Sequence, residues 1–268
     1  MKINLVDNTF AHCNFSSNPL PPINTAKYIE WVREDSNNDL VVYTDNNIPA
    51  HKSSKSIAWL LEPREIKSSG YEYVIKNAEK FNSIWSYDKE IIDNIPNAQF
   101  SPFGGCWIKD IDRKVHNKTK DFSIIASNKK QTKGHKLRHE IISASSNRID
   151  TYGGGYNPID NKIEGLKDYR YHFVIENVNR DYFFTEKLID CFITGTIPIF
   201  WGCPSIGDFF DTEGMIIFND LLDLKEKLKL CTESFYNNKL DIIKDNFYRA
   251  EKYTLAEDWI YNNILSND

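Results

Sequence analysis

The sequence predicts an α/β protein of two domains that face each other across a cleft. Short apolar runs typical of strands alternate with amphipathic runs typical of helices, a pattern that indicates βαβ units and mostly parallel sheets. The alternation stops once, at the polar and highly charged segment 109–121, KDIDRKVHNKTKD, and then restarts. The length of 268 residues accommodates two domains of about 100–150 residues each, although one large domain is also compatible with it.

In the N-terminal half, runs of β-branched and aromatic residues mark the strands, and apolar residues at helical spacing mark the helices. The expected strands are 2–7, 39–45, 55–62, 83–88 and, as strand or loop, 98–105. The expected helices are 23–34, 70–81 and 89–95. Residues 8–22 are rich in Asn, Ser and Pro and are expected to form a loop, and Pro63 is expected to end the strand before it.

The same alternation continues after the polar segment. The expected strands are 121–127, 148–155, 169–177, 196–202 and 214–220. The expected helices are 135–146, 185–195 and most of 221–264. The sequence therefore predicts an N-terminal domain at 1–115 and a C-terminal domain at 116–268, whose last helix can pack back on the N-terminal domain.

Composition excludes some classes of protein. The net charge of −5 argues against a dedicated nucleic-acid binder, which usually carries a basic excess. No apolar run approaches the roughly 20 residues of a membrane-spanning helix, and the N-terminus lacks the apolar core of a signal peptide. The five cysteines are widely spaced without a C-x-x-C pair, as expected for reduced thiols. We expect a cytoplasmic protein without an integral membrane segment.

Charged residues gather where the strand at 169–177 leads into the next helix. Thr185 can cap that helix, which places Glu186 and Lys187 in its first turn, at the carboxyl end of the strand. A helix N-terminus with a lysine favours an anion, and a glutamate beside it can accept protons from two hydroxyl groups. This combination suggests a nucleotide or nucleotide-sugar site, although a helix cap with surface charges gives the same pattern.

Residues 173–206, FVIENVNRDYFFTEKLIDCFITGTIPIFWGCPSI, resemble the signature of the α-1,3/4-fucosyltransferase family, especially its bacterial members. That signature combines Phe-Glu-Asn, a short loop, Tyr-(Val/Phe)-Thr-Glu-Lys and a later Gly-x-(Ile/Val)-Pro. Weaker similarity reaches back through SNKKQTKGHKLRHEIISA and IDTYGGG. In the first 110 residues it is limited mainly to WLLEP and to SIWSYD with FSPF.

The resemblance implies a GT-B fold of two Rossmann-like domains that face each other across a cleft. The nucleotide-sugar donor, GDP-fucose, would bind in the C-terminal domain, and a saccharide acceptor would bind mainly through the N-terminal domain. The reaction would invert the anomeric centre and need no metal and no other cofactor. The acceptor would be a surface glycan or a lipid-linked saccharide.

The family's functional residues carry over to positions of this sequence as follows. Arg138 and Lys187 match the pair that neutralises the diphosphate, while Asn177, Tyr182 and Glu186 match positions lining the nucleotide-sugar pocket.

Glu62 matches the catalytic glutamate at the end of a strand and is the expected general base, with Glu65 in reserve. Glu186 is also a candidate catalytic carboxylate, because it could stabilise an oxocarbenium-like transition state. Gly154, in the turn Gly153-Gly154-Gly155, could let the backbone approach a phosphate or could simply form a tight turn.

Several alternatives stay open. Val178 stands where the family has Ser or Thr, so the donor could be another nucleotide-sugar, with a pentose or a different deoxy-sugar. The alternative to an enzyme is a non-catalytic module that binds a nucleotide-sugar or a glycan. The string Asp110-Ile111-Asp112 resembles a metal-binding D-x-D, but in a polar segment it is expected to be solvated. His135 and His139 lack an apparent third ligand, and we expect no metal site.

Overall fold

The computed structural model describes residues 1–8, 25–33, 40–145 and 148–267. Its contacts divide the chain into two compact units. The N-terminal unit comprises Met1–Gly105, Asp181–Phe183 and Leu255–Asp268. The C-terminal unit comprises Cys106–Arg180 and Phe184–Thr254. Of the expected loop at 8–22, all residues except Asn8 lie outside the described residues, and Cys13 is among them.

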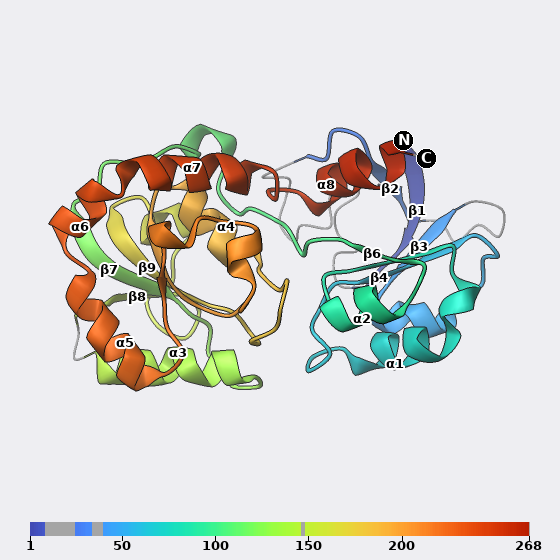
Figure 1. Cartoon of the computed structure of the whole chain (residues 1–268), viewed down its shortest axis with the longest axis horizontal. Coiled ribbons are helices and arrows are strands. Elements are labelled where there is room, and N and C mark those ends of the chain that lie inside the picture. Colours follow the sequence, from blue (N-terminus) through green and yellow to red (C-terminus); the bar gives the residue numbers. More distant parts are fainter. Residues whose placement is uncertain (9–24, 34–39, 146–147, 268) are drawn as a thin grey trace. The chain divides into compact units, whose positions relative to one another are not determined.

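The N-terminal unit is built on a parallel sheet with the strand order β2-β1-β3-β4-β5-β6 (Figure 1). Its strands are β1 Lys2–Val6, β2 Glu30–Val32, β3 Val41–Thr44, β4 Ser56–Leu60, β5 Ser83–Ser86 and β6 Ala98–Phe100. The central strand β4 is buried along its whole length. Its side chains alternate between two cores: Ile57 and Trp59 face one, and Ala58 and Leu60 face the other.

Helices cover both faces of this sheet. Helices α1 (Ser68–Asn77) and α2 (Lys89–Asn94) contribute Tyr71, Val74 and Ile91 to one core. Helix α8 (Ala256–Asn263) contributes Ala256 and Ile260 to the other and lies on the opposite side (Figure 1). The C-terminal helix thus belongs to the N-terminal unit.

The helix predicted at 23–34 is wrong for the part that the structure describes. Residues Glu30–Val32 form β2, which pairs in parallel with β1 through Lys2↔Glu30 and Asn4↔Val32. The Trp31 side chain is buried in the core that α8 covers. Pairing with a distant strand therefore overrides a local apolar spacing that also fits a helix.

The C-terminal unit has a second parallel sheet, with the order β11-β10-β9-β7-β8. Its strands are β7 Lys120–Ile125, β8 Asp150–Tyr152, β9 Tyr169–Ile175, β10 Ile197–Trp201 and β11 Ile216–Ile217. Every residue of β9 and β10 is buried, as expected for central strands covered on both faces.

Helices also cover both faces of the second sheet. Its helices are α3 Lys133–Ala144, α4 Glu186–Ile193, α5 Leu221–Lys227, α6 Glu233–Asn238 and α7 Leu240–Glu251. Helices α3 and α5 lie on one side, and α4 and the end of α7 on the other (Figure 1). Phe184, just before α4, and Leu188, Cys191 and Phe192 on it recur at helical spacing and are all buried in one cluster.

Two parallel-sheet units covered by helices confirm the predicted α/β class.

The polar segment 109–121 lies in the C-terminal unit and contains a short 3-10 helix, Asp110–Asp112, and the first residues of β7. Among the described residues, no helix has the length and apolar character required to cross a bilayer.

The N-terminus of α3 approaches the end of β9 so closely that only glycine fits. A Cβ atom on Gly134 would lie 1.7 Å from the carbonyl oxygen of Glu176 and 3.0 Å from that of Asn177. The amide of Gly134 donates to the Asn177 carbonyl at 3.1 Å, so this contact also joins helix and strand by a hydrogen bond.

We expect Gly134→Ala to lower the free energy of unfolding by about 2 kcal/mol or more, because the added methyl group must push α3 away from backbone atoms. Gly154→Ala is the matched control, since a Cβ there meets nothing within 4 Å. The control should change stability by less than about 0.5 kcal/mol. Urea denaturation measures both, and equal effects of the two substitutions would contradict the close approach.

Candidate functional site

A buried carboxylate at the end of β9 fixes the start of α4. Glu176 follows β9 directly and is fully buried. Its Oε1 accepts a hydrogen bond from the amide of Thr185 at 2.8 Å, and the Thr185 hydroxyl donates to its Oε2 at 2.9 Å. The Thr185 oxygen also accepts from the amide of Lys187 at 3.4 Å, which confirms the predicted N-cap.

The first turn of α4 carries a cluster of opposite charges. Glu186 Oε1 lies 3.3 Å from Lys187 Nζ and 3.5 Å from Lys162 Nζ. Burial alone would raise the pKa of the Glu186 carboxyl, but the two lysine charges outweigh burial and lower that pKa to about 2. Glu186 is therefore ionised at neutral pH and can accept hydrogen bonds from hydroxyl groups.

Arg138 reaches the same place from α3. Its guanidinium is buried, and Nε and Nη2 both donate to the carbonyl oxygen of Ile175, the last residue of β9. Nη2 also donates to Asn177 Oδ1 at 3.1 Å. Burial lowers the pKa of Arg138, while Glu176 and Glu186 oppose that effect. The other amino nitrogen, Nη1, makes no hydrogen bond within the described parts of the chain.

These elements enclose a pocket of about 230 Å³ in the C-terminal unit. Four residues predicted from the sequence line it: Arg138, Gly154, Glu186 and Lys187. Asn177 adjoins it through its hydrogen bond to Arg138. Of the predicted groups, the pocket thus brings together two cations, an ionised carboxylate and a glycine turn, next to the carboxyl ends of β7 and β9.

Three further ionisable residues line the pocket and were not predicted: Lys162, His172 and Asp190. Lys162 Nζ donates to Asp190 Oδ2 at 2.9 Å and lies 4.4 Å from the centroid of the Trp107 ring. Burial raises the pKa of the Asp190 carboxyl, and Lys162 opposes that shift. Asp190 could have been predicted from the sequence, because it is a carboxylate inside the apolar run 188–193. No local pattern marks Lys162.

The other two predicted residues, Glu62 and Tyr182, belong to the N-terminal unit. The amide of Glu62 donates to Asp45 Oδ1 at 3.2 Å, and its carbonyl accepts from the Tyr71 hydroxyl at 3.0 Å. Both backbone groups of Glu62 are therefore fixed. Tyr182 has a positive φ of 64° and packs edge-on against Phe100, with ring centroids 5.6 Å apart.

Within the described ranges, no group of three or more His, Cys, Asp or Glu side chains is arranged to hold a metal ion. Asp110 is exposed, and Arg113 pairs with it at 3.0 Å. His139 lies 2.5 Å from the Tyr156 hydroxyl and 3.0 Å from the carbonyl of Lys129. These contacts account for both of its ring nitrogens.

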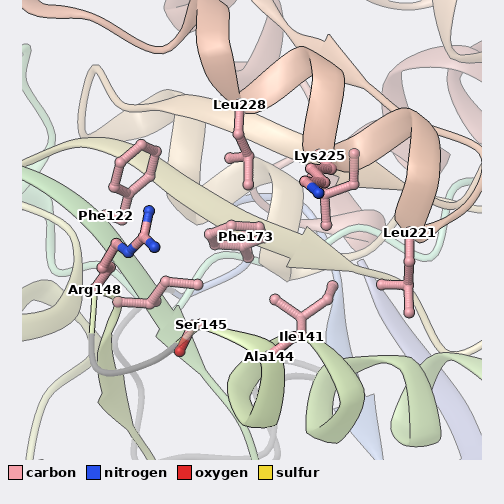
Figure 2. A pocket seen from close by; sticks show the side chains of 11 residues that line it. Phe122, Ile141, Ala144, Ser145, Arg148, Phe173, Leu221, Lys225 and Leu228 are labelled. Carbon is pink, nitrogen blue, oxygen red and sulfur yellow. The ribbon is translucent and has the colours of Figure 1, made fainter.

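A second pocket of about 390 Å³ lies between α3, α5 and the sheet of the C-terminal unit (Figure 2). The side chains of Phe122, Ile141, Phe173 and Leu228 point into a shared hollow, with Arg148 and Lys225 beside them. Its lining contains none of the site residues predicted above. The smaller, charged pocket is therefore the candidate functional site.

Comparison with known families supports this choice. Residues 115–234 match the family model described as glycosyltransferase family 10 (fucosyltransferase), C-terminal domain. This range contains the whole lining of the charged pocket. The match confirms the resemblance to fucosyltransferases that residues 173–206 predicted.

Similar proteins agree with the family model. An α-(1,3)-fucosyltransferase of Helicobacter pylori is 32% identical over 128 residues, which cover 42% of this chain and 26% of that protein. The chain thus matches about a quarter of that relative's length. A crystal structure of an α1,3-fucosyltransferase with GDP superposes with a TM-score of 0.57 at 17% identity, covering 96% of this chain and 92% of the other.

A second crystal structure, of an α1,3-fucosyltransferase with GDP-fucose, gives a TM-score of 0.56 at 18% identity. It covers 92% of this chain and 81% of the other. At these identities the likeness shows the fold, and it confirms the predicted GT-B class.

The hydroxyl of Thr185 connects Glu176 to α4, so its removal should cost more stability than removal of its methyl group. We expect Thr185→Val to lower the free energy of unfolding by about 2–3 kcal/mol, because a buried carboxylate loses a donor and the helix loses its cap. Thr185→Ser keeps the hydroxyl and should cost about 1 kcal/mol. Urea denaturation distinguishes the two variants, and a larger loss for Ser than for Val would contradict this role.

Proposed function

We propose that this chain is a glycosyltransferase that moves fucose from GDP-fucose to a hydroxyl group of a saccharide acceptor. The observation that carries the proposal is the charged pocket, in which Arg138, Lys187 and Glu186 lie together. The pocket falls inside the range that matches the fucosyltransferase family model. Fold likeness to fucosyltransferases solved with GDP and with GDP-fucose is consistent with this donor.

In this proposal the diphosphate binds to Arg138 and Lys187. Arg138 Nη1 is open to a ligand, while Nε and Nη2 hold the guanidinium against β9. Lys187 is held near Thr185 and two carboxylates, and its ammonium can turn toward a phosphate as a point charge. Together the two cations would offset the negative charge that develops on the leaving diphosphate, and they could replace a metal ion in that role.

The remaining pocket residues would hold the rest of the donor. Glu186 is ionised and can accept hydrogen bonds from the ribose hydroxyls or stabilise positive charge on the sugar in the transition state. Asn177 would keep Arg138 oriented, and the backbone at Gly154 would approach a phosphate. Tyr182 is proposed to line the nucleotide-sugar pocket as well.

We propose an inverting reaction with Glu62 as general base. Inversion requires a base within reach of the acceptor hydroxyl, on the face of the sugar opposite to the leaving group. The backbone of Glu62 is held by Asp45 and Tyr71, which supports a fixed position for its carboxylate. In this scheme the N-terminal domain, predicted as 1–115, serves the acceptor, and the C-terminal domain, predicted as 116–268, serves the donor.

The proposal is tested by measuring product formation from GDP-fucose, with a mixed saccharide acceptor pool, in the presence and absence of EDTA. We expect turnover that EDTA leaves unchanged. Glu62→Gln should lower kcat by about 10²–10⁴-fold, because the base is lost, while GDP affinity changes less than about twofold.

Glu65→Gln is the matched control, and it should keep full activity. If Glu65→Gln abolishes turnover and Glu62→Gln does not, the base is Glu65. Preferential use of UDP-sugars or of another GDP-sugar would reject the fucose assignment. Binding of GDP without any transfer would favour the non-catalytic binding module.

A further inference from the structure

His172 lies on β9, where it pairs with Ser123 of β7, and it is 5% exposed. Its Nδ1 is 2.7 Å from Ser123 Oγ, and that hydroxyl donates to the carbonyl oxygen of Gly165 at 2.6 Å. A carbonyl can only accept, so the single hydroxyl proton of Ser123 is directed to Gly165. Nδ1 must therefore carry a proton and donate to Ser123 Oγ.

The other ring nitrogen is consequently an acceptor. Burial, followed by the charges of Lys162 and Lys118, lowers the pKa of His172 to about 3, so the ring is neutral at physiological pH. The Gly165 carbonyl favours a proton on the ring, in keeping with an Nδ1–H group directed at the Ser123–Gly165 pair. In a neutral ring with a proton on Nδ1, Nε2 has a free lone pair.

Nε2 makes no hydrogen bond to any residue in the described ranges, yet the ring lines the charged pocket. Because it faces the pocket, this lone pair is available to a ligand, and a ligand that supplies a donor can form a hydrogen bond there. An ionised phosphate has no proton to give, and Arg138 and Lys187 already suit it. The complementary ligand group is therefore an N–H or O–H donor.

We propose that His172 Nε2 accepts a hydrogen bond from the nucleoside part of the bound nucleotide and so helps to select the nucleoside. This inference rests on the proposed function. His172 is then a specificity-determining residue of the pocket, and the donor that bonds to its Nε2 is a ribose hydroxyl or a base N–H group. Ser123 acts as a positioning residue, because its hydroxyl holds the tautomer that leaves Nε2 open.

The test is a calorimetric comparison of the wild-type chain and His172→Leu. Each is titrated with GDP and with four analogues that each lack one donor: 2′-deoxy-GDP, 3′-deoxy-GDP, inosine diphosphate and N1-methyl-GDP. We expect His172→Leu to weaken GDP binding about tenfold. For the analogue that lacks the bonded donor, wild type and variant should bind equally.

A merely structural role would weaken all five ligands by the same factor, and that result would overturn the inference. So would an effect seen with GDP-fucose but absent with GDP, because the donor would then belong to the sugar. If His172→Leu does not fold, Ser123→Ala serves as the second variant. This variant keeps the imidazole ring but removes the hydroxyl that holds the proton on Nδ1. It should weaken GDP binding and, like His172→Leu, match the wild type for the analogue that lacks the bonded donor.

A conservative variant tests the hydrogen bond, and GDP binding by the wild type shows whether the inference or the proposed function has failed. His172→Gln retains a side-chain acceptor and should recover part of the GDP affinity lost in His172→Leu. A Gln variant no better than Leu would count against a hydrogen bond at this site. If wild type binds no GDP at all, the proposed donor is wrong and this inference fails with it, whereas tight GDP binding with no analogue dependence rejects the inference alone.

Discussion

The buried carboxylate of Glu176 is the constraint on which the site depends. Both of its oxygens bond to Thr185, which starts α4, and so they set the place of Glu186 and Lys187. Its own backbone carbonyl touches Gly134 in α3, the helix that carries Arg138, and a Cβ on Gly202 after β10 would lie 2.8 Å from its Cγ. One residue therefore aligns two helices and the strand ends between them. A larger side chain at Gly134 or Gly202 would disturb this alignment.

The pocket balances opposite charges rather than collecting cations. Lys187 and Lys162 keep Glu186 ionised, while Lys162 also offsets the buried Asp190. Both lysine ammonium groups are thus paired with carboxylates. A diphosphate bound as we propose would compete with those carboxylates for Lys187, whereas Arg138 would offer Nη1 without giving up its bonds to β9. In the proposed complex, Arg138 would therefore bind from a fixed position, while the flexible side chain of Lys187 would adapt to the phosphate.

Much of the fold follows from local pattern, because buried parallel strands and amphipathic helices have distinct periods. The segment 30–32 is the exception, because its apolar spacing fits both a helix and a strand. Only its pairing with β1 makes it a strand. For the site, four of the predicted residues come together in one pocket because they flank strand ends, where side chains from distant segments converge. His172 and Lys162 could not be found in this way. Their positions in the pocket arise from the register of β7 with β9 and from the segment before β9, which are long-range features.

The central claim is that the charged pocket of the C-terminal unit binds the donor nucleotide. Hydrogen–deuterium exchange of the full chain with and without GDP tests this claim most directly. The account predicts slower amide exchange at 134–138, 153–155 and 185–188 when GDP is bound, and unchanged exchange at 221–228 beside the apolar pocket. Slower exchange confined to 221–228, or no change at any of these segments at saturating GDP, would contradict it.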